Sequence, residues 1–166
     1  MRAIVQRVTA ASVSVDDQVI GQIGPGLVLL VGVRDSDSAA AAAYLAEKIA
    51  HLRIFADEDS KFHRSVLAVG GAVLLISQFT VYGDSRKGRR PNFSAAAPPE
   101  VAAPLLEMLA GELRSRGLEV QTGQFAAHMQ VTLTNDGPVT VIVDTPERLS
   151  QSTPPAASRQ RPERPS

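Results

Sequence analysis

The sequence predicts a single α+β domain, in which a mainly antiparallel twisted sheet or partial barrel packs against two helices. Short β-branched and aliphatic runs outnumber helical segments, and only the stretches that start near Asp37 and near Pro98 have a helical period. The 166 residues, 44% of them hydrophobic, are enough for one core and too few for two. One domain, residues 1–145, is therefore expected.

The first strands are expected to form an antiparallel meander. Alternating runs bounded by turn residues are typical of strands. Asp16 and Asp17 supply one turn, and Gly24-Pro25-Gly26 leads into a more apolar strand. The expected strands are residues 2–8, 11–15, 18–23 and 27–33.

Two helices follow from the spacing of apolar residues. The first begins after Asp35, Ser36 or Asp37, each of which is able to cap it. Its buried face is expected to contain Leu45, Ile49 and Leu52. The second begins at Pro98 or Pro99 and ends at Gly117, because proline is tolerated in a first turn and glycine accepts the left-handed conformation after a helix. Its apolar side is expected to contain Val101, Leu105, Met108, Leu109 and Leu113.

The remaining strands frame two unusual segments. Residues 72–76 read as a strand buried on both faces. Residues 131–135 and 139–144 read as a final hairpin with Asp136-Gly137-Pro138 near its turn. From about residue 146 the chain is rich in Ser, Pro, Gln and Arg, so residues 146–166 are expected to be a disordered tail without a catalytic role.

Composition removes several classes of function. The chain has no cysteine, which excludes thiol nucleophiles and thiolate zinc sites and fits a reducing compartment. No apolar run reaches membrane-spanning length and the N-terminus does not resemble a signal peptide, so a cytoplasmic protein without a membrane partner is expected. The net charge is zero, so any contact with RNA must be local. His51, His63 and His128 lack metal-ligand spacing, and no phosphate-loop, nucleophile-elbow or dinucleotide motif is present. We expect no metal and no cofactor.

Polar residues end the buried strand at Ser77-Gln78-Phe79-Thr80. Pockets are commonly built at such strand ends, although small polar residues there also serve only to bond the neighbouring backbone. Thr80 has no base at a spacing that would activate its hydroxyl as a nucleophile. The Gly137-Pro138 peptide exposes two carbonyl groups with little shielding; from the sequence alone a trans bond is the better expectation.

Four ordered motifs carry a resemblance to a known family. They are Gln6-Arg7-Val8, Ser77-Gln78-Phe79-Thr80, residues 125–131 and residues 135–140. Together they resemble the D-aminoacyl-tRNA deacylases, from Met1 to about Asp144. The resemblance implies a homodimeric hydrolase with shared active sites that cleaves the ester between a D-amino acid and the tRNA 3′ end and rejects the L form. Mischarged glycyl-tRNA would also be a substrate.

The resemblance also implies roles for individual residues. Backbone amides near Phe79 and Thr80 would stabilise the developing oxyanion, while the 2′-hydroxyl of the substrate's terminal adenosine lies beside the ester. A cis Gly137-Pro138 bond would project two carbonyls into the partner's pocket, oriented by Arg7, whose alternative role is that of an edge-strand charge. Substrate would be bound by Ser77, Gln78, Phe125 and Met129, the last two of which are equally plausible as plain core residues.

One concentrated basic segment, with Arg86, Lys87, Arg89 and Arg90, follows the Ser77–Thr80 motif. Such runs are often only solvated loops, but here the proximity to the implied ester site predicts contacts with tRNA phosphates. Phe93, shortly after it, is either a stacking platform for a base or a loop anchor.

Two other functions remain open from the sequence. One is an editing domain that removes an L-amino acid from tRNA. The presence of Arg7 and Gly137-Pro138 argues against this alternative. The other is a tRNA-binding or dimerisation module of the same fold without catalysis. The editing domain differs from a D-specific deacylase in the ratio of D- to L-aminoacyl ester that it hydrolyses. The non-catalytic module differs in hydrolysing neither ester.

Overall fold

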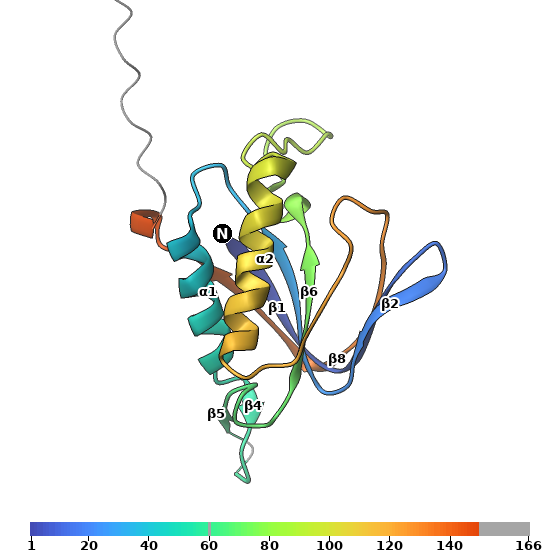
Figure 1. Ribbon diagram of the computed structural model, residues 1–166, viewed down its shortest axis with the longest axis vertical. Coiled ribbons are helices and arrows are strands. Elements are labelled where there is room, and N and C mark those ends of the chain that lie inside the picture. Colours follow the sequence, from blue (N-terminus) through green and yellow to red (C-terminus); the bar gives the residue numbers. More distant parts are fainter. Residues whose placement is uncertain (60, 150–166) are drawn as a thin grey trace, which may run out of the picture.

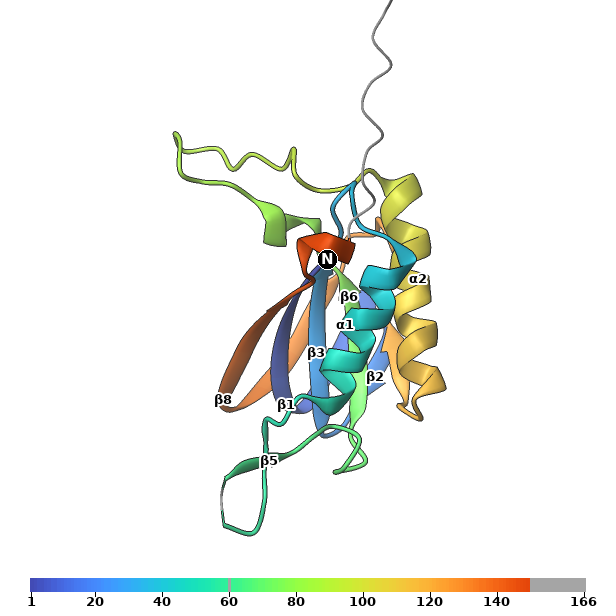
Figure 2. The same ribbon diagram turned by 90° about the vertical axis from the view of Figure 1, so that its left-hand side faces the viewer.

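The structure, a computed structural model, describes residues 1–59 and 61–149 and places two helices on one face of a curled six-stranded sheet (Figures 1 and 2). The predicted α+β class with two helices is confirmed. The strands are β1 Arg2–Val15, β2 Gln18–Ile23, β3 Gly26–Gly32, β4 Phe55–Ala56, β5 Phe62–Arg64, β6 Ala72–Ser77, β7 Val120–Thr122 and β8 Gln130–Asp144. The helices are α1 Ala39–His51 and α2 Pro99–Ser115, with short 3-10 turns η1 Phe79–Tyr82 and η2 Glu147–Leu149.

Strand β1 is the centre of the sheet. It runs unbroken through residues 2–15, where two strands were predicted, and pairs with β8 along one side. On its other side the first half pairs with β3 and the second half with β2. The predicted meander is therefore wrong, because β3 returns to β1 and not to β2. The turn at Gly26 passes so close to β6 that an added Cβ would lie 1.9 Å from the carbonyl oxygen of Ala72.

The sheet is mixed, where a mainly antiparallel one was predicted. Strands β3 and β6 are parallel, as are β6 and β7. The crossovers that join them contain α1 and α2, as parallel pairing requires. The near-continuous apolar sequences of β3 and β6 are the signature of parallel strands covered on both faces, and both strands are indeed buried almost throughout.

The predicted C-terminal hairpin is also wrong. Residues 130–144 form one strand, and both of its halves pair antiparallel with β1. Gln6 lies opposite Thr140 whereas Val8 lies opposite Asn135, so four residues of β8, 136–139, face only Arg7. The segment that was predicted to be a turn is therefore a bulge of four residues within one strand.

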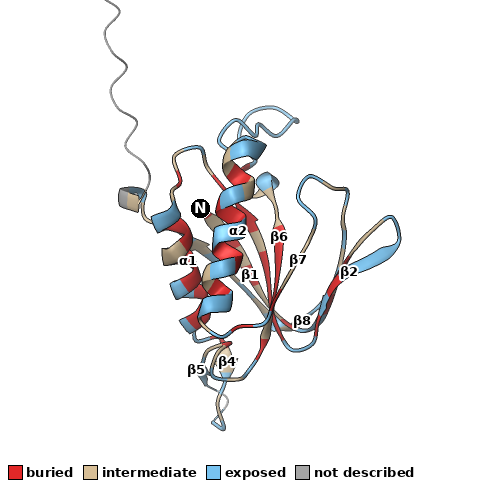
Figure 3. Ribbon diagram, in the orientation of Figure 1, coloured by how far each residue is buried: buried red, intermediate tan, exposed pale blue. Residues whose placement is uncertain are grey.

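Two apolar cores lie on the two sides of β3 and β6. In Figure 3, much of β6 and parts of α1 and α2 are coloured as buried. Leu29 and Val73 point to the larger core beneath α1 and α2, while Val28 and Leu74 point into the smaller core inside the curl of the sheet. Strand β2 bends over this second core until the position of a Cβ on Gly21 is 3.2 Å from the carbonyl oxygen of Thr122 on β7. The sheet is therefore close to a barrel.

The helices follow their predicted spans, with two differences. The cap position of α1 is Ser38, because Asp37 is engaged elsewhere. On α2, Met108 is 48% exposed, since the buried face turns toward Leu106 and Ala110. Gly117 ends α2 with a φ of +90° and allows the Leu118 N–H to donate to the carbonyl oxygen of Leu113, as predicted for a left-handed stop.

The described chain continues past β8 to Leu149. The Leu149 carbonyl oxygen accepts a hydrogen bond of 2.6 Å from Ser38 Oγ at the start of α1. The rest of the expected tail, 150–166, lies outside the described residues. Neither helix among the described residues is long and apolar enough to cross a membrane.

Candidate active site

A cavity of about 630 Å³ opens at the carboxyl ends of β3 and β6, where neighbouring parallel strands commonly form a ligand site. Its floor comes from the ends of these strands and its walls from η1, the first turns of α2 and the segment 125–131. The lining residues are Val31, Gly32, Val33, Ile76, Ser77, Gln78, Phe79, Phe93, Ala96, Ala97, Pro99, Ala102, Leu106, Phe125, Ala126, Ala127, His128, Met129 and Val131.

Five residues predicted to contact substrate meet in this cavity. Ser77, Gln78 and Phe79 enter it from the end of β6, and Phe125 and Met129 enter it from the segment before β8. Thr80 does not line the cavity; its exposed side chain contacts the side-chain amide of Gln78. Thr80 Oγ1 is therefore placed to orient Gln78.

The backbone turns sharply at the cavity wall. Gln78 donates its N–H to the carbonyl oxygen of Val31 on β3, and η1 begins at the next residue. Within residues 1–59 and 61–149, the N–H groups of Phe79 and Thr80 have no acceptor, as is usual for the first residues of a helical turn. Two neighbouring amide donors are thus available beside the cavity.

Two aromatic rings stand at the mouth of the cavity. The centroids of Phe79 and Phe93 are 5.2 Å apart with the rings at 77°, an edge-to-face contact. Phe93 is brought there by a loop that closes on itself, since the backbones of Asp84 and Asn92 exchange two hydrogen bonds of 2.8 Å. Phe93 is 36% exposed, so it anchors the loop on Phe79 and still keeps an accessible surface.

The same closed loop contains the basic segment. Arg86 is bound to Asp84 at 2.7 Å, and this contact lowers the pKa of Asp84 to about 2. Lys87, Arg89 and Arg90 are exposed in this loop. Among these four basic residues, Arg86 already has its charge balanced by a carboxylate, that of Asp84.

Met129 forms the inner wall of the cavity because Gly123 makes room for it. A Cβ on Gly123 would lie 2.5 Å from the Met129 sulfur, so no larger residue fits while Met129 keeps this position. Between them, Ala126 has a φ of +61°, which is uncommon for a residue with a side chain. This bend directs Phe125 and Met129 to the same cavity.

Gly137 and Pro138 lie outside this cavity, in the bulge of β8. Their peptide bond is cis, and both residues are exposed. Gly137 has a φ of +125°, a conformation that residues with side chains rarely adopt. A Cβ at Gly137 would also meet Val139 at 2.8 Å and the Arg7 guanidinium at 3.1 Å.

Arg7 fastens the bulge to the rest of the chain. Its Nε donates to the backbone carbonyl of Asp136 at 3.2 Å and lies 3.0 Å from the Asp136 carboxylate. Its Nη1 donates to the carbonyl oxygen of Ile54 at 2.6 Å. The guanidinium also lies over the rings of Phe55 and Phe62, with 5.9 and 5.3 Å to their centroids.

Asn135 closes the base of the bulge; it belongs to the motif of residues 135–140, but this role was not predicted from the sequence. Its Oδ1 accepts from the Val139 N–H at 2.8 Å and its Nδ2 donates to Thr140 Oγ1 at 3.0 Å. An Asn two residues before a Gly-Pro pair could have indicated this role, because Asn side chains often form hydrogen bonds with nearby backbone groups. No comparable signal marked Phe55 and Phe62, which reach Arg7 only in the folded chain.

Titratable groups contribute little to the cavity. His128 is the single ionisable side chain among its lining residues. Tyr82, at the end of η1, is buried behind them; burial raises the pKa of its hydroxyl to about 12. Within the described part of the chain, no group of three His, Cys, Asp or Glu side chains is arranged to hold a metal ion. The chemistry that these residues offer is hydrogen bonding from backbone and amide groups.

Comparisons with known proteins identify the family of the chain. A model of the family described as "D-Tyr-tRNA(Tyr) deacylase" matches residues 4–144. The D-aminoacyl-tRNA deacylase of Roseiflexus sp. (strain RS-1) is 59% identical over 145 residues, which cover 87% of this chain and 94% of the relative. The protein of the same name from Thermus aquaticus is 59% identical over 148 residues, covering 89% of this chain and 97% of the relative.

Two solved structures share the fold. One, described as c-Myc DNA Unwinding Element Binding Protein, has a TM-score of 0.83 and 38% identity, and the match covers 88% of this chain and 99% of that one. The other, a probable eukaryotic D-amino acid tRNA deacylase, has a TM-score of 0.76 and 17% identity, covering 86% and 97%. From the family match and the identities above, the chain belongs to the D-Tyr-tRNA(Tyr) deacylase family.

Proposed function

We propose that this deacylase removes D-amino acids from tRNA by holding the ester against backbone amides and rejects the L form through carbonyl groups supplied by a second copy of the chain. As a member of its family the protein is a hydrolase that acts on the ester bond of D-aminoacyl-tRNA. The finer points, namely the source of catalysis, the chiral filter and the dimer, are the proposal.

The observation that carries the catalytic part is the pair of N–H groups at Phe79 and Thr80. They have no acceptor within the described residues and adjoin the cavity that receives Ser77, Gln78, Phe125 and Met129. Amide donors aimed at an ester carbonyl stabilise the negative charge that develops when it is attacked. No side-chain nucleophile is needed, because the 2′-hydroxyl of the substrate's terminal adenosine lies beside the ester. Thr80 then orients Gln78 and does not attack.

The chiral filter is assigned to the carbonyl oxygens of Gly137 and Pro138. They would accept hydrogen bonds from the substrate ammonium and leave no room for the side chain of an L-residue, so that the L form is excluded by collision. Glycine has no side chain to collide, and glycyl-tRNA is therefore proposed as a further substrate. Arg7 holds the bulge through Asp136 and Ile54.

A second copy of the chain is proposed because the bulge and the cavity are separate in one copy. Among the described residues β8 pairs only with β1, so its other edge has unused hydrogen-bonding groups. Ile142 on β8 is 61% exposed. Both features support a homodimer that places the bulge of each copy in the cavity of the other.

The tRNA acceptor end would pass the closed loop that carries Lys87, Arg89 and Arg90. Exposed cations beside an ester site favour phosphate contacts without base reading. Catalysis on tRNA is a process of the cytoplasm, which is the proposed location.

The test is a paired deacylation assay with one tRNA charged with D-tyrosine or with L-tyrosine. Release of the D form alone supports hydrolysis and the filter together. Release of both forms contradicts the filter, and the editing of an L-aminoacyl-tRNA would become the better account. Binding of tRNA without any release would instead point to a module without catalysis.

A further inference from the structure

The hairpin of β4 and β5 lies outside the six-stranded sheet and projects from one end of the molecule (Figures 1 and 2). Ile54, directly before β4, is 5% exposed and joins the hairpin to the core. Phe62 on β5 is 51% exposed and belongs to neither apolar core. Packing of the core therefore does not account for this ring.

The ring of Phe62 lies at the guanidinium of Arg7, with 5.3 Å from Cζ to the ring centroid. A cation over an aromatic ring is attracted by the negative face of the ring. The Arg7 side chain is 11% exposed, so this attraction is screened less than at an open surface. Phe55 lies 5.9 Å from the same Cζ but also packs against the larger core, so its position has a second cause.

The hydrogen bonds of Arg7 leave one freedom to its planar guanidinium. Nε is bound to Asp136, and Nη1 donates to the carbonyl oxygen of Ile54. These contacts fix the line through the two nitrogens but hold the tilt of the plane about that line less firmly. Nη2 lies off the line, and it is the atom that a Cβ on Gly137 would meet at 3.1 Å. A ring under the guanidinium therefore limits the tilt and, with it, the position of Nη2 beside the bulge.

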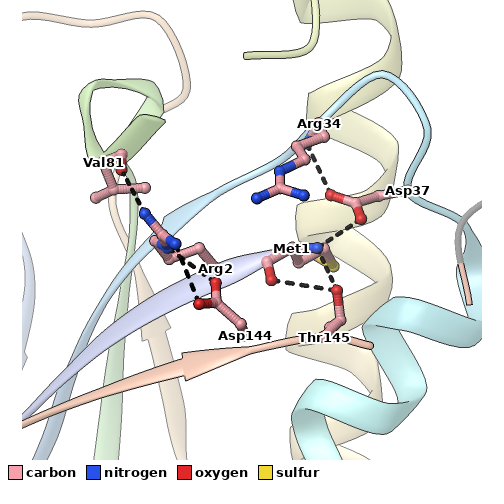
Figure 4. A network of polar contacts seen from close by, with 7 residues as sticks. All are labelled: Met1, Arg2, Arg34, Asp37, Val81, Asp144 and Thr145. Carbon is pink, nitrogen blue, oxygen red and sulfur yellow. Dashed lines mark hydrogen bonds and ion pairs between the residues drawn. The ribbon is translucent and has the colours of Figure 1, made fainter. Parts of the chain in front are cut away.

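Arg2, at the start of the same strand, is held differently (Figure 4). Its Nε and Nη2 donate to the two carboxylate oxygens of Asp144 at 2.8 and 3.1 Å, and its Nη1 donates to the carbonyl oxygen of Val81 at 3.5 Å. It also lies over the buried ring of Tyr82 at 5.5 Å, as Arg34 does at 4.9 Å. Acceptors thus meet all three of its nitrogens, whereas the guanidinium at the bulge has acceptors for two within residues 1–59 and 61–149.

We propose that Phe62 is a specificity-determining residue of the deacylase: through Arg7, its ring holds the Gly137-Pro138 bulge in the orientation that excludes L-aminoacyl esters. The inference rests on the chiral filter proposed above and adds to it a residue that lies outside both the cavity and the bulge. Phe62 is a positioning residue, since it acts through Arg7. Loss of the ring therefore changes the choice between D and L esters.

The experiment compares Phe62→Leu with the parent chain in the paired assay of D-tyrosyl- and L-tyrosyl-tRNA. Leucine keeps an apolar side chain but has no aromatic face. The D-to-L ratio of initial rates is expected to fall about 2- to 30-fold, the factor that corresponds to the strength of one cation–π contact. Both rates scale with the amount of folded enzyme, so a merely structural defect leaves the ratio unchanged. A ratio equal to that of a D-selective parent would overturn the proposal.

Two further variants assign the effect to the ring. Phe62→Tyr keeps an aromatic face and is expected to keep the ratio of the parent. Lys61→Gln changes the neighbouring residue, whose side chain is 65% exposed, and is also expected to keep the ratio. A fall in either variant as large as that in Phe62→Leu would contradict the role of the ring.

A double-mutant cycle tests whether Phe62 acts through Arg7. In an Arg7→Gln background the cation that the ring holds is absent, so Phe62→Leu is expected to cause no further fall in the ratio. Additive falls would show that the two residues act separately and would overturn the proposal.

A measurement without substrate separates failure of this inference from failure of the filter. The ring current of Phe62 affects the NMR signal of the Arg7 Nε–H group, so this signal is expected to move in Phe62→Leu and to stay in place in Lys61→Gln. An unmoved signal in Phe62→Leu would overturn the contact and this inference. A signal that moves, in a protein whose parent chain releases the D and L forms equally, would refute the filter itself, and the role of Phe62 with it.

Discussion

The ring of Phe93 meets the ring of Phe79 edge to face, with 5.2 Å between centroids, although a loop of basic residues separates the two in sequence. The contact ties the basic loop to the wall of the active-site cavity. We propose that Phe93 serves at this contact as a stacking platform for an incoming base.

Replacement of Phe93 by alanine is expected to raise KM for D-tyrosyl-tRNA by about 2- to 10-fold with little change in kcat, since an aromatic pair contributes about 0.5–1.5 kcal/mol. Steady-state deacylation kinetics measure this. Val19→Ala is a suitable control, because Val19 is equally apolar, is 59% exposed and does not line the cavity. An unchanged KM in Phe93→Ala would place the ring outside the substrate path.

Replacement of Arg7 by lysine should lower the ratio of D- to L-tyrosyl-tRNA release. A lysine keeps the charge but lacks the planar fork with which Arg7 donates to both Asp136 and Ile54 while remaining over the Phe62 ring. The bulge would then lose its fixed orientation. The measurement is the pair of deacylation rates at one enzyme concentration, and a ratio equal to that of the parent would contradict the role given to Arg7.

Gly137→Ala is expected to destabilise the chain by about 1–3 kcal/mol and to impair D-selective turnover, because the residue has positive φ and its Cβ would press on Val139 and Arg7. Urea unfolding measures the first effect. Gly111→Ala is the matched control: a Cβ there meets nothing, and within α2 the change should stabilise by about 0.5–1 kcal/mol. If both variants shifted stability in the same direction, the backbone argument at Gly137 would fail.

Replacement of Arg89 and Arg90 by glutamine should weaken tRNA binding uniformly and flatten its dependence on salt. On a single strand, every phosphate that the protein no longer neutralises reduces the steepness of log K against log salt by about 0.7. Arg86→Gln should have a smaller effect, because Arg86 is bound to Asp84. Binding titrations at several salt concentrations decide this. A larger effect from Arg86 would reverse the assignment.

The pair of Arg2 and Asp144 should make stability sensitive to acid. The hydrogen bond from Arg2 holds the pKa of Asp144 below its usual 3.8, so the unfolded chain takes up a proton before the folded chain does. The stabilisation is present above pH 3.8 and disappears as pH falls through the lower, folded pKa. Asp144→Asn should therefore lower Tm modestly at pH 7, by the equivalent of about 0.2–1 kcal/mol for an exposed pair, and not at all at strongly acid pH. Melting curves across this range provide the test.

The sequence predicted local elements better than it predicted how they pair. Residues 72–76 were assigned correctly because a short β-branched run has few alternatives, and Gly117 marked the end of α2. The bulge at Gly137-Pro138 was taken for a hairpin turn, since alternating runs on both sides of turn residues look the same in either case. The difference lies in β1, whose length lets both halves of β8 pair with it. Met108 was wrongly predicted to be buried. The buried side of α2 includes the small residues Ala102 and Ala110, which a search for large apolar residues does not detect.

At the site, the sequence showed which residues gather and not what holds them. Ser77 and Met129 were linked only through motif order, and the structure brings them to one cavity. The support of Arg7 by Phe55 and Phe62, and of Tyr82 by Arg2 and Arg34, depends on residues far apart in the chain. Such contacts leave no periodic pattern in a single sequence.

The pairing of β1 with β8 has a consequence for synthesis of the chain. Arg2 lies opposite Asp144, so β1, the first strand of the described residues, waits for β8, the last of them, before its second edge is covered. Contacts of such long sequence separation slow folding and leave a strand edge open to other chains in the meantime. The nascent protein is therefore expected to need protection from aggregation until translation is complete.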